Sequence, residues 1–245
     1  MYIALLLLLA AAPLMAQVNI EHYRGKKGVT GGARVSLSTD IGNVDVINSD
    51  GAGNLTFNTE TGTYLAVFKG GVGFLGGKRF ANSGVLHTRY THKGNPRWQP
   101  ELYLQGDYAK SRLLDSRFLA GAGLRWIARA GEKFSASLGS ALMWERETLD
   151  LLSGDQHEDL SSLARSSHYV NIRLSGRVTF STTAYYQFAI SDPGDARILG
   201  TSELTTPLVG PLHQTTALDF RTDSDPPLGV KKTDLKLATS FGLKF

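Results

Sequence analysis

The histidines and acidic residues are the side chains of this sequence that could bind a metal ion. The chain contains six histidines and no cysteine, so a metal site would depend on imidazole and carboxylate ligands. His87 and His92 are separated by an odd number of positions, so on a strand they face opposite sides. The segment 155–159 contains Asp155, His157, Glu158 and Asp159, but it lacks the spaced ligands of a calcium loop. We interpret it as a solvated loop, and the sequence predicts no metal site and no cofactor.

Hydrolysis of an ester or amide by a catalytic serine is the other chemistry to consider. A catalytic serine needs a histidine base and an orienting group within hydrogen-bond reach. Ser166, Ser167 and His168 form the nearest local combination, and no Gly-x-Ser-x-Gly elbow occurs. We interpret the two serines as the start of a strand, so the protein is predicted not to be an enzyme. A site assembled from distant segments is the alternative that the residues leave open.

Composition and charge exclude several classes of protein. Without cysteine, the chain is not a disulfide-stapled scaffold. Its 42% hydrophobic content is too high for a disordered chain. The 26 Lys and Arg are scattered singly among 22 Asp and Glu, giving a net charge of +4 and no basic stripe, so nucleic acid is not an expected partner.

Residues 1–16 are typical of a secretory signal peptide. An apolar block, Tyr2–Ala12, precedes a small-residue site at 14–16, after which the chain becomes polar. The block is shorter than the roughly 20 apolar residues of a transmembrane helix. We therefore expect a signal-peptide helix at 1–16 and a periplasmic segment at 17–30.

Polar and apolar residues alternate along the rest of the chain. Near the carboxyl end, Leu237, Phe241 and Phe245 share one face, and Lys236 and Lys244 lie on the other. This period of two predicts a strand, because helical spacing would place the lysines in the apolar stripe. Similar runs, separated by Gly, Asn, Asp and Pro breaks, predict about twelve strands of about 10 to 16 residues each.

The two faces of these strands differ in charge. Charged residues occur in mid-strand on the polar face, whereas the apolar face has no comparable charge. Strands of about 10 or more residues reach across a bilayer, and a sheet in hydrocarbon must close so that no edge is left unpaired. We therefore predict that 31–245 form an all-β, closed antiparallel up-and-down transmembrane barrel of about 12 strands, surrounded by lipid. The lumen is expected to be lined by Glu101, Asp107, Arg125, Glu145 and Arg173.

A secreted soluble β-sandwich that binds a ligand is an alternative fold, because its inner faces would be equally apolar. Such a sandwich would bury Leu138, Phe180, Leu237 and Phe241 together in one core. The predicted barrel is narrow, so side chains either fill its lumen or leave a pore.

Segment 223–234, Asp-Ser-Asp-Pro-Pro-Leu-Gly-Val-Lys-Lys-Thr-Asp, resembles the closing hairpin of a bacterial outer-membrane family of uncharacterised activity. That family includes the salt-stress-induced outer-membrane protein. The turn at 42–45, the segment 113–125 and the strand start at Tyr169 are also similar to it, so the resemblance covers roughly 31–245. It implies an outer-membrane barrel of a Gram-negative bacterium, with a structural or passive channel-like role linked to salt or osmotic stress. An outer-membrane lipid hydrolase or protease is the alternative.

The final strand adds one expected partner. Leu237, Phe241, Leu243 and the terminal Phe245 resemble the signal by which outer-membrane barrels are recognised by the barrel assembly machinery. We therefore expect this machinery to bind the carboxyl-terminal strand. The sequence does not indicate the oligomeric state.

Overall fold

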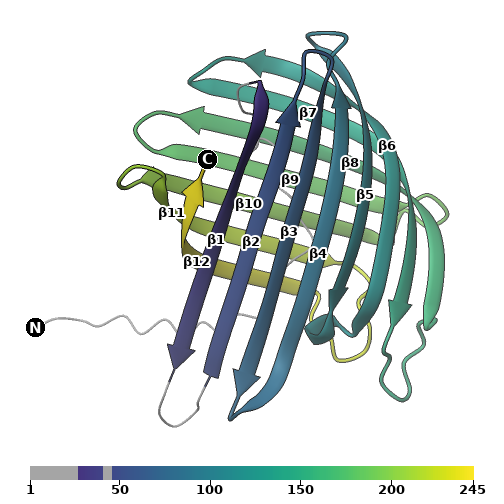
Figure 1. Cartoon of the computed structure of the whole chain (residues 1–245). Helices are drawn as coiled ribbons and strands as arrows, with labels where there is room; N and C mark the ends of the chain where they lie inside the picture. The colour runs from purple at the N-terminus through teal and green to yellow at the C-terminus, as the bar shows by residue number, and fades with distance from the viewer. Residues whose placement is uncertain (1–26, 41–45) are drawn as a thin grey trace, which may run out of the picture.

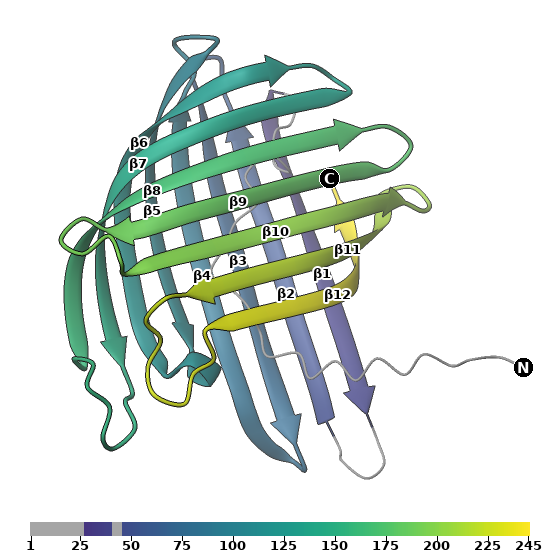
Figure 2. The ribbon, with the colours of Figure 1, turned by 180° about the vertical axis from the view of Figure 1, so that it is seen from behind.

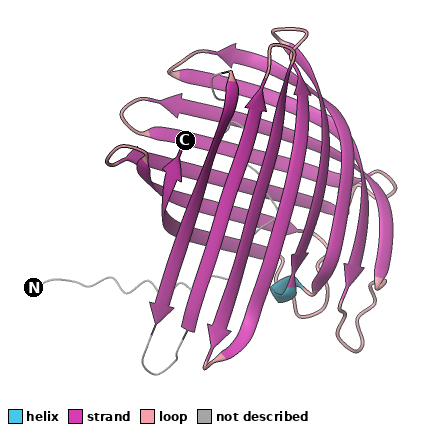
Figure 3. Cartoon of the chain, in the orientation of Figure 1, coloured by secondary structure: helices cyan, strands magenta, loops and turns pink. Residues whose placement is uncertain are grey.

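The chain forms a closed barrel of antiparallel strands (Figure 1). The computed structural model describes residues 27–40 and 46–245. Within these residues, a short 3-10 turn, η2 (Lys110–Arg112), accompanies a structure that is otherwise strand and loop (Figure 3). The twelve strands are β1 (Gly28–Asp40), β2 (Val46–Asn58), β3 (Gly62–Leu75), β4 (Lys78–His92), β5 (Trp98–Ala109), β6 (Leu114–Ala130), β7 (Phe134–Leu149), β8 (Leu160–Ser175), β9 (Thr179–Ala189), β10 (Ala196–Pro207), β11 (Leu212–Asp223) and β12 (Thr233–Lys244).

The barrel closes between its first and last strands. Gly31 and Phe245 exchange two backbone hydrogen bonds, of 2.9 and 3.0 Å. The β1–β12 pairing extends only from Gly32↔Lys244 to Val35↔Phe241, whereas β1 pairs with β2 along its whole length. Figures 1 and 2 show the strands of one wall, β1–β4, crossing those of the opposite wall, β9–β12, steeply. The short pairing is where these two strand directions meet.

The outer face of the barrel is apolar, as the alternation requires. Leu138, Leu237 and Phe241 are 45%, 44% and 56% exposed, and Phe180 lies on the same outward face. These side chains surround the barrel and do not meet in a common core. The predicted closed barrel is confirmed, and the β-sandwich alternative is wrong.

The two ends of the barrel differ in their connections. One end, here called the turn end, holds the start of β1, the end of β12 and the short connections such as 59–61 and 131–133. The other, the loop end, holds the longer connections 150–159 and 224–232. Bacterial barrels have short periplasmic turns and longer extracellular loops. The turn end corresponds to the former and the loop end to the latter.

Some sequence-based boundaries differ from the structure. β1 begins at Gly28 and not at residue 31, because Gly28 already pairs with Asn58 of β2. The predicted signal peptide at 1–16, and most of the segment 17–30, lie outside the described residues. No helix in the described part of the chain is long and apolar enough to cross a membrane.

Candidate lumen site

The structure places the five predicted lumen residues on the inward face of the barrel wall. Glu101, Asp107, Arg125 and Glu145 are buried, and Arg173 is half-buried near the turn end. They do not form one site, because they lie at different heights and have different partners. Glu101 and Arg125 meet near mid-barrel, whereas Asp107 and Glu145 belong to a network at the loop end.

A compact set of polar and aromatic side chains crosses the lumen near mid-barrel, and we call it the middle layer. Arg89 Nη1 donates a hydrogen bond to Glu101 Oε2 at 2.9 Å, and the Tyr169 hydroxyl donates to the same oxygen at 2.6 Å. The Arg89 guanidinium also lies 5.1 Å from the Tyr103 ring centroid and 5.6 Å from that of Tyr169. Tyr185 packs against Tyr169 with ring centroids 5.3 Å apart. The cavity left in this layer has a volume of about 30 Å³, enough for only one or two water molecules.

A glycine in β7 makes room for the middle layer. Gly139 pairs with Tyr169 in the β7–β8 ladder, and a Cβ at position 139 would lie 2.1 Å from Tyr169 Cε1. The tyrosine ring therefore lies directly over the glycine backbone. This close approach fixes the ring against the inner wall, with its hydroxyl directed to Glu101.

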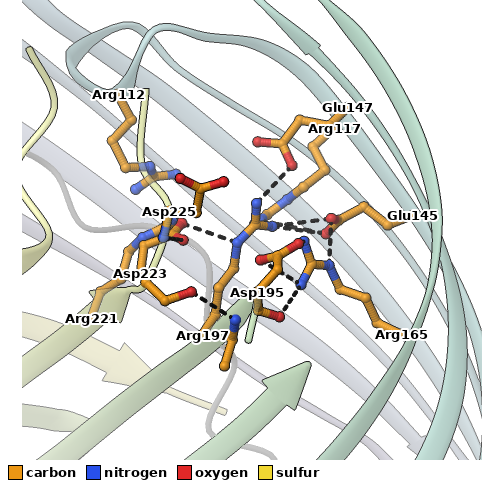
Figure 4. A network of polar contacts seen from close by, with 12 residues as sticks. Arg112, Arg117, Glu145, Glu147, Arg165, Asp195, Arg197, Arg221, Asp223 and Asp225 are labelled. Carbon is orange, nitrogen blue, oxygen red and sulfur yellow. Dashed lines mark hydrogen bonds and ion pairs between the residues drawn. The ribbon is translucent and has the colours of Figure 1, made fainter. Parts of the chain in front are cut away.

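Glu145 is the centre of a charge network at the loop end, shown in Figure 4. Arg165 Nε donates to its carboxylate at 2.8 Å, and Arg197 Nη1 donates to both of its oxygens at 3.1 and 3.0 Å. Arg117 Nη1 lies 3.9 Å away. Glu145 and Arg165 are each only 1% exposed, so the centre of this ion cluster is buried.

The cluster extends from Glu145 to neighbouring strands. Arg197 also donates to Glu147 at 3.1 Å and to Asp223 at 3.0 Å, and Arg165 binds Asp195 at 2.6 Å. Together these contacts join β7, β8, β10 and β11 across the interior. We call Glu145, Glu147, Arg165, Asp195, Arg197 and Asp223 the loop-end cluster.

Two further ion pairs face the lumen, one beside the loop-end cluster and one between β1 and β10. Arg117 forms a two-pronged pair with Asp107, at 3.0 and 2.8 Å. Arg34 of β1 reaches Glu203 of β10 at 2.7 Å, although these strands are not neighbours in the barrel. The first pair joins two neighbouring strands, and the second joins strands that are separated by two others, β12 and β11.

At the loop end, two loops are bound to each other through Asp155. Its carboxylate accepts hydrogen bonds from His157 Nδ1 at 2.6 Å and from the Leu228 backbone N–H at 2.7 Å. His157 Nε2 lies 3.4 Å from Asp225 of the second loop. The acidic segment 155–159 therefore joins loop 150–159 to loop 224–232, and in the described residues no group of His, Asp and Glu is arranged to hold a metal ion.

This loop contact is expected to depend on pH. Hydrogen bonding to Asp155 raises the pKa of His157 above 6.5, and the bonds donated by His157 lower the pKa of Asp155 to about 2. The histidine contribution is present below pH 6.5 and is lost as the pH rises through the raised pKa. The aspartate contribution is present above pH 3.8 and is lost as the pH falls toward 2.

The measurement is an NMR titration of the His157 imidazole in detergent micelles. We expect a midpoint above the ordinary value, which Asp155→Asn lowers. Asp192→Asn, which removes a loop carboxylate bonded to Gly194, is the control and should leave the midpoint unchanged. An Asp155→Asn midpoint equal to that of the parent would contradict the assignment.

The outer wall contains a serine–histidine contact. Ser166 Oγ and His168 Nε2 of β8 lie 3.0 Å apart on the outward face, with the His168 ring stacked on Phe188. Among the described residues, no acidic or amide group bonds to this histidine. Leu142, the ladder partner of Ser166, lines an apolar hollow of about 1030 Å³ on the outer wall. The pair therefore borders a surface suited to acyl chains.

The carboxyl-terminal residues predicted to be recognised during assembly lie on the outside. Leu237, Phe241, Leu243 and Phe245 are all exposed on the outward face of β12 or at its end. Their binding by the barrel assembly machinery stays a prediction.

An apolar outer wall around a lumen of paired charges defines the outer-membrane type of β-barrel. The chain belongs to the family described as "Protein of unknown function, DUF481", whose model matches residues 33–245. The predicted membership of an outer-membrane barrel family of uncharacterised activity is confirmed to this extent. The link to the salt-stress-induced member stays a prediction. A search of the curated proteins finds no match.

Several solved barrels are similar in fold. The NanC porin is 12% identical, covers 88% of this chain and 97% of its own, and gives a TM-score of 0.47. The KdgM porin is 10% identical, with 89% and 99% coverage and a TM-score of 0.44. The translocator domain of the autotransporter NalP from Neisseria meningitidis is 10% identical, with 89% and 87% coverage and a TM-score of 0.49. At these identities the likeness concerns the fold alone.

Proposed function

We propose that the protein is a passive channel of the bacterial outer membrane whose conduction is limited by the middle layer. The single observation that supports this is the chain of contacts by which Arg89, Glu101, Tyr103, Tyr169 and Tyr185 cross the lumen beside a cavity of only about 30 Å³. Water and small ions are the permeants that fit such a constriction. The loop-end cluster would hold the wall rigid around it.

The proposal includes the link to salt. Ionic strength screens charge pairs, more strongly where water reaches them than where they are buried. Asp195 is 21% exposed in its pair with Arg165, so the rim of the loop-end cluster is open to ions. External salt would weaken this rim pair and so loosen the wall that the loop-end cluster holds around the middle layer. The channel would then open more readily as external salt rises, which suits a pore active under osmotic stress.

Single-channel recording in planar bilayers tests this function. We expect low conductance for the parent protein and several-fold higher conductance for Tyr169→Ala, because the substitution removes the ring that links Glu101 to Tyr185 in the middle layer. Tyr186→Ala is the matched control, since Tyr186 lies on the next strand but faces outward at 45% exposure. The ratio of conductance to bulk conductivity should also rise with salt in the parent protein.

Two results would contradict the channel. A parent protein that already has the steady conductance of a wide pore would show that the middle layer does not restrict flow. A Tyr169→Ala barrel that is folded, by its heat-modifiable mobility, but silent would favour a purely structural function.

A lipid acyl hydrolase is a second candidate, favoured by the contact between Ser166 and His168 beside the outer-wall hollow. In this function the histidine would accept the serine proton as the hydroxyl attacks an ester carbonyl, and would give it to the alcohol that leaves. Water would then hydrolyse the acyl-serine and release the fatty acid. In mixed micelles with phospholipid, we expect fatty-acid release that falls by about a hundredfold or more in Ser166→Ala. Ser162→Ala is the control, because that outer-wall serine bonds Trp144 Nε1 at 2.8 Å and not a histidine. No release by the parent protein, or equal release by Ser166→Ala, would exclude this candidate.

A further inference from the structure

Arg112 is a buried cation without a hydrogen-bond partner. The residue is 6% exposed, and none of its three guanidinium nitrogens makes a hydrogen bond. The nearest carboxylate oxygen, Asp107 Oδ2, is 4.0 Å from Nη2, and Asp107 already receives two bonds from Arg117. A buried guanidinium in this state has lost its hydration without an equivalent gain.

The backbone holds Arg112 in this position. Arg112 ends η2, and the next residue, Leu113, adopts a left-handed conformation with φ of 55°. The Leu113 N–H donates to Lys110 O at 3.1 Å, and its carbonyl accepts from Asp150 N at 2.8 Å. The backbone next to Arg112 is therefore held by hydrogen bonds, which fix the position of the arginine.

A second arginine faces the same space. Arg221 of β11 has one bond, from Nη2 to Asp223 at 2.5 Å, while its Nη1 is buried without a partner. Arg112 and Arg221 both line a cavity of about 160 Å³ at the loop end (Figure 4). This volume exceeds by several-fold the space that one water molecule requires.

Charges of both signs line this cavity, but none of the lining carboxylates makes a hydrogen bond to Arg112. Among these carboxylates, Asp195, Glu147 and Asp223 are engaged by Arg165 and Arg197, and Glu158 and Asp225 lie in the two loops at the loop end. Burial, together with the positive charges of Arg221 and Arg117, lowers the pKa of Arg112, although Asp107 and Asp234 oppose this effect. The guanidinium still remains charged at neutral pH.

We propose that this loop-end cavity is a binding site for a small oxyanion, a phosphate or a carboxylate, held between Arg112 and Arg221. The planar guanidinium groups offer paired N–H donors that match the oxygens of such an anion. The bound anion supplies the hydrogen-bond acceptors that Arg112 and Arg221 Nη1 lack within the protein. The site is separate from the middle layer and does not depend on conduction.

Calorimetric titration of the detergent-solubilised protein with inorganic phosphate tests the site. We expect saturable binding, weakened about tenfold or more in Arg112→Met because the charge-assisted bonds are lost. Arg112→Lys should bind phosphate with an affinity between those of the parent and Arg112→Met, since lysine keeps the positive charge but lacks the paired N–H donors of the guanidinium. Arg177→Met, at an exposed arginine in a turn-end connection, is the matched control and should bind like the parent.

Thermal unfolding gives an independent readout. Phosphate should raise the unfolding temperature of the parent more than chloride does at equal ionic strength, because a ligand specific for the folded state stabilises it. Arg112→Met should lose this difference yet be at least as stable as the parent without phosphate. If Arg112→Met does not fold, Arg221→Met and Arg112→Lys replace it.

Three outcomes would overturn the proposal. The first is an equal effect of phosphate and chloride on the parent. The second is unchanged phosphate binding in Arg112→Met or, where that variant does not fold, in both replacements. The third is a folded Arg112→Met that is clearly less stable than the parent in phosphate-free buffer, which would show that the guanidinium is already satisfied within the protein.

Discussion

Replacing Glu145 with glutamine is expected to destabilise the folded barrel by about 3–5 kcal/mol, the range for removing one partner from a buried ion pair. Glu145 accepts bonds from Arg165 and Arg197 at 2.8 to 3.1 Å, and Arg117 lies 3.9 Å away. The amide keeps the size of the side chain but removes its charge. Three guanidinium groups would then share an interior that has lost its central negative charge.

Urea unfolding in lipid vesicles, followed by tryptophan fluorescence, measures this effect. Glu60→Gln is the control, because Glu60 pairs with Lys27 at 2.6 Å on a surface where the two side chains are 80% and 74% exposed. An exposed pair contributes at most about 1 kcal/mol. Equal unfolding free energies for Glu145→Gln and Glu60→Gln would show that the loop-end cluster does not stabilise the barrel.

Placing an arginine on the lipid face is the second large change. Leu142 lies in the middle of β7 and is 63% exposed on the outward face. We expect Leu142→Arg to cost about 2–4 kcal/mol in a bilayer, as for basic residues at the midplane of other barrels. The cost arises because the guanidinium must be solvated in hydrocarbon or must reach the interface.

A second substitution by arginine, nearer the membrane surface, distinguishes the cost of placing arginine in hydrocarbon from a general cost of placing arginine on the outer face. Ala128 is also exposed on the outward face, but it lies close to the turn end of β6. Ala128→Arg is expected to cost about 0–1 kcal/mol in the same vesicles. If both substitutions were tolerated equally, Leu142 would not lie in hydrocarbon, and the membrane placement of the barrel would be wrong.

The fold was largely predictable because the strand period of two separates the inward and outward faces directly. The alternation around Phe180 and around Leu237 predicted two strands whose outward faces the structure confirms. Local departures were not predictable. The bulges at Gly73/Phe74 and Asp107/Ala109 insert residues into the ladder, which a strict alternation does not anticipate.

The lumen site was predictable only in part. Alternation indicates that Glu101 and Glu145 face inward, but it does not give the height of a side chain or its partner across the barrel. Those depend on strand tilt and stagger, which bring Arg197 to Glu145 and Arg34 to Glu203 from distant positions in the sequence.

Aromatic residues of the middle layer were missed for a different reason. Tyr169 and Tyr103 lie on the polar face of their strands, where a tyrosine resembles any other polar residue in the pattern. The sequence held one further indication for Tyr169, namely the glycine at position 139 that accommodates its ring. That indication can be used only when the β7–β8 register is known.

Ser166 and His168 show how one pattern allows two interpretations. The serines at 166 and 167 do lie within a strand, β8, which begins earlier at Leu160. Because side chains alternate, Ser167 faces the lumen while Ser166 and His168 share the outer face. Strand geometry itself therefore creates the contact on which the hydrolase candidate depends.

The brief contact between the first and last strands also has a mechanical consequence. The hydrogen bonds that join β1 to β12 are concentrated between residues 31–35 and 241–245, so few bonds resist separation there compared with any other junction. Under tension or during membrane insertion, the barrel should open first between β1 and β12. Amide protons on both sides of this junction should exchange with solvent deuterium before those of the β6–β7 hairpin on the far side of the barrel.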